Sequence, residues 1–228
     1  MAQLIADLDA GRVRANLERI EEELAVAASR APAGPGGSPR RKPEVLAAVK
    51  YVRAAELPKL AAAGIRVVGE NRAQELEAKV AEHGELFDWD FIGQLQSRRV
   101  RSIVPHVRLI HSVASESALR ELARHASLAR AGLRILVEVN VAGEDGKAGV
   151  SPERLDAFIE SSPVPVAGLM TMPPLAAEPE QSRRWFAALR QLADERGLEQ
   201  LSMGTSQDYA VAAEEGATIV RIGTKLYD

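Results

Sequence analysis

Eight short apolar segments, separated by amphipathic stretches, constrain the fold of this chain more than any other feature. Several of them are apolar on both faces, as expected of parallel strands that are covered by helices. The predicted strands are 45–49, 65–69, 89–93, 107–113, 134–141, 164–170, 199–204 and 217–223. Eight such strand–helix units in one chain of 228 residues predict a closed (β/α)8 TIM-type barrel.

The main alternative is a doubly wound open sheet, which alternates strands and helices in the same way. No G-x-G-x-x-G motif follows the first predicted strand, and this weakens that alternative. The weakest unit of the barrel pattern is the segment 96–106, which is short for a helix. The pattern as a whole still favours the barrel.

The chain before the first strand predicts an appendage to the barrel. Residues 1–30 form a charged amphipathic pattern that predicts a helix and not a signal peptide, and no apolar run approaches membrane length. Residues 31–43 are dominated by Pro, Gly and Ser, which predicts a flexible surface loop. Because the helix has no core of its own, we expect a single domain over 1–228, with the barrel in 45–228. A cytoplasmic protein without membrane contact is expected.

Composition excludes several classes of function. The net charge is −3, and the basic residues are balanced by 32 acidic ones, so no nucleic-acid surface is expected. The absence of cysteine rules out disulfides, thiol catalysis and thiolate metal sites. The four histidines lack the spacing of metal ligands, so no metal is expected. His111 is the one histidine at a predicted strand end, and we expect it to line the barrel mouth or to cap the barrel.

Polar residues follow nearly all of the predicted strands. In a barrel of this type the active site lies where the strands end, so a cluster of this kind favours a ligand-binding mouth. The residues at these ends are Lys50, Glu70, Asn71, Gly93, Gln94, His111, Ser112, Asn140, Met170, Thr171, Ser202, Arg221, Gly223 and Thr224.

The last two strands predict a phosphate site. Barrels commonly bind phosphate after strands 7 and 8, through backbone N–H groups and a helix N-terminus. Gly223 lets a phosphate approach the backbone, while Ser206 and Thr224 add hydroxyl donors. Two simpler interpretations stay open, because Ser206 also suits a helix N-cap and Gly223 a tight turn.

Lys50 ends the first predicted strand, although this chain has only six lysines among its 29 basic residues. Taken alone, it reads as a strand-end residue that reaches into water. In a closed barrel, however, strand 8 pairs with strand 1, which places the Lys50 amine beside the phosphate site and suggests a Schiff base to an aldehyde. Arg221 shares the face of Gly223 and is either paired with a glutamate such as Glu70 or is a donor to a ligand. Pyridoxal 5′-phosphate (PLP) combines the aldehyde, the phosphate and a ring nitrogen.

Motifs along the chain after residue 44 resemble, in order, those of the pyridoxal phosphate homeostasis proteins, which are relatives of the alanine racemase barrel. They are VLAAVK, VVGENRAQEL, WDFIGQLQ, LIHSVAS, ILVEVNVAGEDGKAGV, GLMTMPP, LSMGTSQD and ATIVRIGT. The resemblance implies a racemase-type (β/α)8 barrel that holds PLP on Lys50. It also implies that Ser206, Gly223 and Thr224 hold the phosphate, that Arg221 meets the pyridine nitrogen and that Asn71 lies beside the ring. The family is understood to bind and carry the cofactor and to balance its cellular level, without an established reaction.

The sequence departs from the family pattern in three places. Tyr51 follows the lysine where a small polar residue is usual, Arg98-Arg99 replaces an Asn-Lys pair, and the loop 31–43 is longer than usual. A role of the family lysine would fall to Arg99, whose guanidinium cannot act as a nucleophilic amine.

Three functions remain after this reasoning. The leading one is a monomeric PLP carrier that donates the cofactor to apo-enzymes and has no catalytic residue; the others are a PLP-dependent amino-acid racemase and a barrel enzyme for another phosphate ester. Racemisation by two bases needs a second acceptor opposite Lys50. We expect Tyr51 to face away from the ring, Tyr209 to lie on the helix beyond the phosphate, and Tyr227 to lie past the last strand. The racemases' second, tyrosine-bearing domain is also not expected, because the sequence stops directly after the eighth strand. Arg221 would disfavour protonation of the ring nitrogen and so weaken the cofactor as an electron sink.

Overall fold

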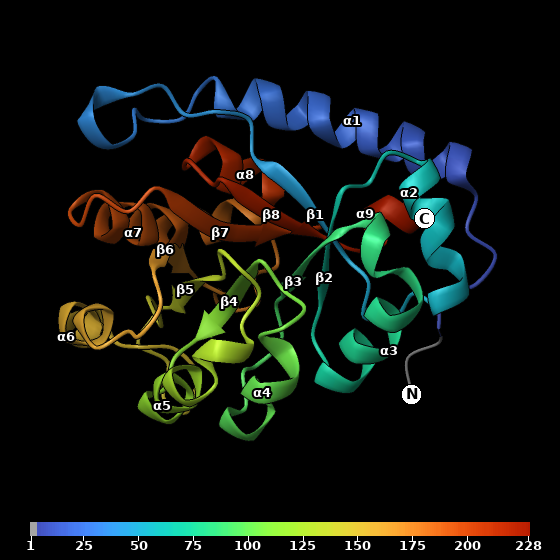
Figure 1. The fold of residues 1–228 in the computed structure, drawn as a ribbon. Coiled ribbons are helices and arrows are strands. Elements are labelled where there is room, and N and C mark those ends of the chain that lie inside the picture. The colour runs from blue at the N-terminus through green and yellow to red at the C-terminus, as the bar shows by residue number, and fades with distance from the viewer. Residues whose placement is uncertain (1–3) are drawn as a thin grey trace.

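The computed structural model describes residues 4–228, which form a closed barrel of eight parallel strands alternating with helices (Figure 1). Parallel pairing of β8 with β1 closes the barrel, with Leu46 opposite Arg221 and Ala47 opposite Ile222. The barrel and all eight predicted strands are therefore confirmed. The strands are β1 (Glu44–Ala48), β2 (Val67–Glu70), β3 (Asp88–Phe91), β4 (Leu109–Val113), β5 (Arg134–Glu138), β6 (Val166–Met170), β7 (Gln200–Thr205) and β8 (Ile219–Ile222).

The helices cover the outside of the strands, as the two-faced apolar pattern of the strands requires. Between β3 and β4 the chain forms only a 3₁₀ turn over Ser97–Arg99 and one turn of α-helix, which agrees with the weak helical pattern there. The helices are α1 (Ala10–Ala28), α2 (Leu57–Ala62), α3 (Ala73–His83), α4 (Val100–Ile103), α5 (Glu116–Arg124), α6 (Leu155–Glu160), α7 (Arg183–Asp194), α8 (Tyr209–Glu214) and α9 (Thr224–Tyr227).

The apolar core has two parts. The larger part lies between the strands and the helices. A smaller cluster with one residue from each of six strands fills the barrel interior, as in other barrels of this type. Its members are Leu46, Val67, Leu109, Leu136, Met170 and Ile219. The barrel is therefore packed, and a ligand site is confined to its mouth.

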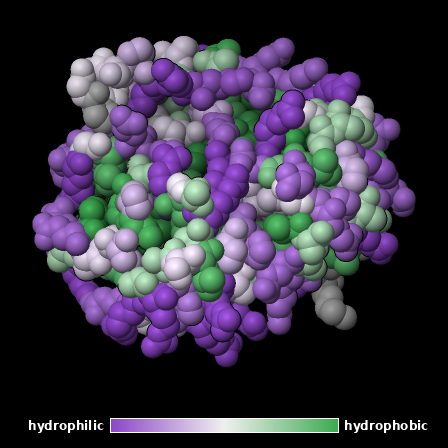
Figure 2. All heavy atoms as spheres, viewed as in Figure 1, coloured by the Kyte–Doolittle hydropathy of each residue, from purple (hydrophilic) through white to green (hydrophobic). Residues whose placement is uncertain are grey.

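Helix α1 lies along the outside of the barrel and contacts α8 and α9 (Figure 1). The Asp9 side chain caps its first turn by accepting a 2.6 Å hydrogen bond from the backbone N–H of Arg12. Ile20 on its inner face is fully buried, whereas the outward-facing residues are mostly hydrophilic (Figure 2). The Asn16 amide donates to the carbonyls of Leu226 and Asp228, at 3.2 and 2.9 Å. The helix thus holds the last residues of the chain against the barrel.

The Pro- and Gly-rich segment 31–43 contains one 3₁₀ turn, over Pro35–Gly37. Near its end the Arg40 side chain is only 5% exposed and forms a 2.6 Å ion pair with Asp194 of α7. The end of this segment is therefore attached to the barrel helices. In residues 4–228, no helix has the length and apolar character that a membrane span needs.

If α1 is part of the fold, its inner face should contribute to stability. We expect Ile20→Ala to lower the free energy of unfolding by about 2–5 kcal/mol, because it leaves a cavity at a fully buried position. The control on the same helix is Val26→Ala, at a side chain that is 56% exposed, with an expected change within about 0.5 kcal/mol. Urea unfolding measures both variants. Equal small effects would show that α1 does not pack on the barrel in solution.

Candidate functional site

A cavity of about 330 Å³ opens at the carboxyl ends of the strands and collects the predicted site residues. All six residues predicted to bind the cofactor line it, namely Lys50, Asn71, Ser206, Arg221, Gly223 and Thr224. They come from four strand ends that are far apart in the sequence, and the closure of the barrel brings them together. Sequence reasoning did not assign the other lining residues to the site, namely Ile5, Ala48, Tyr51, Ile92, Met172, Thr205 and Tyr227.

Lys50 lies in the turn after β1, is exposed, and places Nζ 4.7 Å from the centre of the Tyr51 ring. A buried ion pair stabilises this turn. Lys79 Nζ donates to the Val49 carbonyl at 2.7 Å and to Glu70 Oε1 at 2.6 Å, and both charged side chains are almost fully buried. The carbonyl directly before Lys50 is therefore held in place.

The prediction that Tyr51 faces away from the site is wrong. Strand alternation would send Lys50 and Tyr51 to opposite faces, but β1 ends at Ala48 and both residues lie in the following turn. Ile5 contacts this turn and lines the same cavity, and its N–H donates to the Tyr51 carbonyl at 2.7 Å. No pattern in the sequence pointed to Ile5.

The two other tyrosines lie where they were expected, Tyr209 on a helix and Tyr227 after the last strand. The hydroxyl of Tyr209, in α8, is bonded to Glu23 of α1 and lies outside the cavity lining. Tyr227 lies past β8 but does reach the cavity, where its hydroxyl donates to the Ala48 carbonyl at 3.2 Å. Burial raises the pKa of Tyr227, so its phenol stays protonated.

Ser206 and Gly223 join the ends of β7 and β8. The backbone N–H of Gly223 donates to Ser206 Oγ at 3.1 Å. The N-cap of α8 is Asp208, so the interpretation of Ser206 as a helix cap is wrong. A Cβ atom built on Gly223 would meet only Ala48 Cβ within 4 Å, at 3.9 Å, so space is open above this glycine. The hydroxyls of Ser206 and Thr224 and the open space at Gly223 thus lie at one end of the cavity.

Arg221 is buried, and all four hydrogen bonds that it makes within residues 4–228 go to neutral acceptors. Nη1 donates to the carbonyl and hydroxyl oxygens of Ser202, at 2.9 and 2.6 Å. Nη2 donates to the Thr171 carbonyl at 3.1 Å and to Met172 Sδ at 2.8 Å. Burial lowers the pKa of Arg221 to about 10, which leaves it charged at neutral pH. A pair with Glu70 is excluded, because Glu70 pairs with Lys79.

A chain of hydrogen bonds runs from Arg221 into the barrel. Ser202 Oγ lies 2.8 Å from His111 Nδ1, and His111 Nε2 lies 3.1 Å from Asp90 Oδ2. Arg108 Nε donates to the other oxygen of Asp90 at 2.9 Å. Because Arg221 donates to Ser202, the serine hydroxyl donates to Nδ1, and the Nε2–H of a neutral imidazole donates to Asp90. Burial lowers the pKa of His111, which keeps this imidazole neutral.

The expectation that His111 lines the mouth or caps the barrel is wrong. β4 continues to Val113, so His111 is in the middle of the strand and is fully buried. Its neighbours in the chain are apolar or small, and its partners Asp90 and Ser202 lie on other strands, where no local pattern indicates them. Within residues 4–228 no group of three His, Cys, Asp or Glu side chains is arranged to hold a metal ion.

Asn71 provides an acceptor that the protein itself does not use. Its Oδ1 is buried and has no hydrogen-bond partner in residues 4–228. The backbone carbonyl of Asn71 packs against Gly93, which follows β3. A Cβ atom on Gly93 would lie 2.1 Å from the Asn71 carbonyl oxygen, so only glycine fits at position 93. An unpaired buried acceptor beside a cavity indicates a donor on the ligand.

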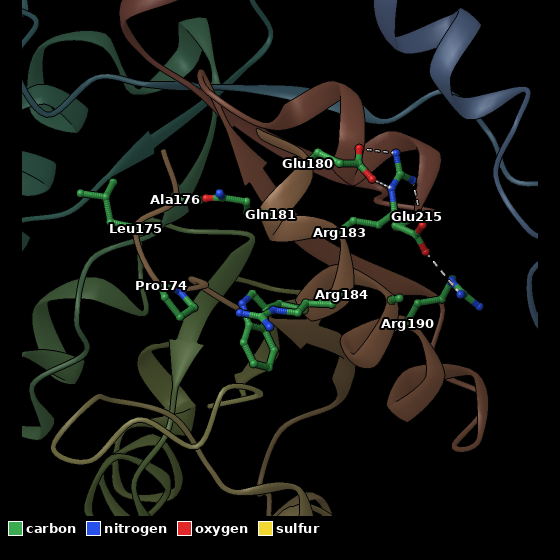
Figure 3. A pocket seen from close by; sticks show the side chains of 11 residues that line it. Pro174, Leu175, Ala176, Glu180, Gln181, Arg183, Arg184, Arg190 and Glu215 are labelled. Atoms are coloured by element: carbon green, nitrogen blue, oxygen red, sulfur yellow. Dashed lines mark hydrogen bonds and ion pairs between the residues drawn. The ribbon is translucent and has the colours of Figure 1, made fainter. Parts of the chain in front are cut away.

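A larger cavity, of about 870 Å³, lies elsewhere, between α7 and the segment 174–176 (Figure 3). Most of its charged groups are paired with one another: Arg183 bonds to Glu180 and Glu215, and Arg190 lies 3.4 Å from Glu215. The Arg184 guanidinium instead lies over the Trp185 ring, 4.4 Å from its centre. None of the six predicted site residues lines this cavity, so we place the candidate site in the smaller cavity at the strand ends.

An amine, two hydroxyls and a buried guanidinium thus line one cavity at the mouth of an eight-stranded parallel barrel, and the whole chain was compared with known proteins. Residues 9–228 match the family model described as "Alanine racemase, N-terminal domain". The pyridoxal phosphate homeostasis protein of Aquifex aeolicus is 39% identical over 222 residues, which cover 92% of this chain and 95% of the relative. The chain therefore belongs to the pyridoxal phosphate homeostasis protein family.

Solved structures show the same fold. The structure of PipY from Synechococcus elongatus with PLP bound is 30% identical, has a TM-score of 0.77, and is matched over 95% of this chain and 100% of that chain. The alanine racemase of Corynebacterium glutamicum, at 18% identity and a TM-score of 0.65, aligns with 100% of this chain and 63% of its own. The latter likeness shows the barrel alone.

The neutral state of His111 predicts a pH dependence of stability. The unfolded state binds a proton on this histidine below about pH 6.5, while the folded state resists it, so the free energy of unfolding falls as the pH drops below that value. His111→Gln keeps one acceptor and one donor but does not titrate. We expect the variant to lose less stability than the unmodified protein between pH 7.5 and pH 5, as measured by urea unfolding. Identical losses would show that His111 is not held neutral.

Proposed function

We propose that this protein binds PLP in the cavity at the strand ends, covalently through a Schiff base on Lys50, and acts as a carrier that supplies PLP to apo-enzymes. The observation that carries the proposal is the meeting of Lys50, from the start of the barrel, with Ser206, Arg221 and Gly223, from its end, around one cavity. The PLP-bound structure of PipY, with the same fold, supports the choice of ligand.

The polar groups around the cavity match functional groups of PLP. The Lys50 amine suits the aldehyde, and the hydroxyls of Ser206 and Thr224 suit the phosphate. The unpaired Oδ1 of Asn71 suits a hydroxyl donor on the ring. A cavity of 330 Å³ lies near the lower end of the range of small-molecule sites, about 300–1,000 Å³.

Arg221 supports a carrier over a catalyst. Bound PLP supplies an electron sink for reactions at the carbon next to an amino group, and it does so best when its ring nitrogen is protonated. Arg221 stays charged at neutral pH and donates hydrogen bonds only to neutral acceptors, so a proton on a ring nitrogen beside it would be repelled. The His111–Ser202 chain holds the guanidinium in this orientation.

A second candidate function, amino-acid racemisation, is favoured by the presence of Tyr51 in the cavity. Two-base racemisation needs proton acceptors on opposite faces of the cofactor. Contact between Lys50 Nζ and the Tyr51 ring places these groups beside each other, which does not suit two opposed bases. Tyr227 is bonded to the Ala48 carbonyl and is held protonated by burial. We therefore rank racemisation second.

Lys50→Ala should abolish the visible absorbance band that PLP acquires when it is bound to a lysine as a Schiff base. Weaker binding through Ser206 and Gly223 should remain, because those contacts do not need the amine. Lys59→Ala is the matched control, since Lys59 lies on α2, pairs with Glu56 and is outside the cavity. A band of unchanged intensity in Lys50→Ala would show that another lysine binds the cofactor.

The phosphate contacts are tested by comparing two ligands. Ser206→Ala and Thr224→Ala should each weaken PLP binding by about 1–3 kcal/mol, the range for a hydrogen bond to a charged group. Neither change should alter the weaker binding of pyridoxal, which has no phosphate. Titration calorimetry with both ligands measures these differences. If pyridoxal binds as well as PLP, or loses the same affinity in both variants, the phosphate does not lie at this end of the cavity.

The carrier and the racemase differ in what the PLP-loaded protein does. We expect it to reactivate a PLP-dependent apo-enzyme, and to form D-amino acids far more slowly than a typical enzyme, whose turnover is about 10 per second. Chiral chromatography and a reactivation assay measure the two activities. Sustained racemisation that disappears in both Lys50→Ala and Tyr51→Phe, without transfer to the apo-enzyme, would reverse our ranking.

A further inference from the structure

The chain contains no cysteine, so its sulfur chemistry rests on methionine. Three methionines lie within the described residues 4–228. Met170 is 3% exposed and Met203 is fully buried, whereas Met172 is 44% exposed. Among the described residues, Met172 therefore carries the one thioether that a dissolved oxidant reaches without opening the core.

Met172 lies in the segment that leaves β6 and lines the candidate site. The segment continues through Pro174 and Ala176, which Figure 3 shows at the edge of the larger cavity, and its Leu175 is 92% exposed. Met172 is thus a partly exposed residue that also forms part of the wall of the site.

The Met172 sulfur contacts the arginine on which the site depends. Arg221 Nη2 lies 2.8 Å from Sδ and 3.1 Å from the Thr171 carbonyl. A thioether is a weak acceptor, so this contact leaves Arg221 able to serve a ligand. A sulfoxide oxygen is a much stronger acceptor, and oxidation also makes the side chain polar.

We propose that Met172 is an oxidation-sensitive modification site that controls release of the ligand from this cavity. Its thioether attacks one oxygen of a hydroperoxide, the O–O bond breaks, and the sulfur becomes a sulfoxide while the peroxide is reduced to water or an alcohol. The sulfur loses two electrons and the peroxide gains them, so no further reactant is needed. The product is reducible by methionine sulfoxide reductases.

Oxidation changes the site in two ways. The new S=O oxygen accepts from the Arg221 guanidinium and so competes with the ligand for its N–H groups. It also introduces a polar group into a wall that includes the apolar side chains of Ile5, Ala48 and Ile92. Both changes should weaken the binding of PLP by the oxidised protein. This inference rests on the proposed function.

The experiment exposes the full-length protein to increasing hydrogen peroxide, follows each methionine by peptide mass, and measures the Kd for PLP at each step. Met170 and Met172 share one peptide, so fragment spectra assign the added oxygen to one of them. We expect one added oxygen on Met172 before any on Met170 or on the Met203 peptide. The Kd should rise about tenfold as Met172 is converted, in line with the loss of one hydrogen bond to a charged group. Treatment with methionine sulfoxide reductases should restore it.

Two variants decide whether Met172 is responsible, each compared with itself before and after peroxide. Met172→Leu should show no rise in Kd, whatever its own affinity, while Met203→Leu should respond like the unmodified protein. Oxidation of Met203 before Met172, an unchanged Kd after full conversion of Met172, or an equal response in Met172→Leu would each overturn the proposal. If the untreated protein does not bind PLP, the proposed function fails and the release mechanism with it, while the peptide masses still show whether Met172 is the selectively oxidised sulfur.

Discussion

The pairing of β8 with β1 is the interaction on which the rest of the structure depends. It joins the two ends of the barrel sequence, so that Lys50 and the segment 221–224, which are far apart in the chain, line one cavity. Neither part makes a site alone: the lysine without its neighbours is a surface cation, and the glycine and hydroxyls without the lysine are a turn. Helix α1 stabilises this closure, because the Asn16 amide donates to the carbonyls of Leu226 and Asp228, at the end of α9, the helix that follows β8.

A second constraint is the burial of charge beneath the site. Arg221 and Lys79 are both buried, and each is compensated in a different way. Lys79 has a carboxylate partner in Glu70 and steadies the turn that carries Lys50. Arg221 donates hydrogen bonds only to neutral acceptors, while the carboxylates of Asp208 and Glu138 act on it through space. A buried charge without a directly bonded counterion is costly, and its position at the cavity wall favours a binding role.

Much of this arrangement could be predicted from the sequence, because it follows from periodicity. Strands that are apolar on both faces predict the barrel, and the barrel rule that sites lie at strand ends selects Lys50, Ser206 and Gly223. The errors occurred where periodicity stops applying. Tyr51 was misplaced because strand alternation was applied to a residue in the turn after β1, which ends at Ala48. His111 was misplaced because it was treated as a strand-end residue although it lies in the middle of β4.

Other features depend on contacts that no local pattern encodes. The hydrogen bonds of His111 join residues on three different strands, and Ile5 reaches the cavity from outside the barrel. Met172 comes two residues after the end of β6, as Lys50 comes two residues after the end of β1, so the rule that selected Lys50 could have selected it too. Its contact with Arg221, however, is visible only in three dimensions. Sequence reasoning thus identified the polar groups of the site but not the groups that orient them.

The central claim is that Lys50 and the phosphate-binding end of the cavity hold the same molecule. The most direct measurement is to reduce the PLP-loaded protein with borohydride, digest it, and locate the added mass among the peptides of its six lysines. We expect one phosphopyridoxyl group per chain, on the peptide that contains Lys50, and much less labelling when pyridoxal replaces PLP at the same concentration. Labelling at another lysine, or equal labelling by pyridoxal, would contradict it.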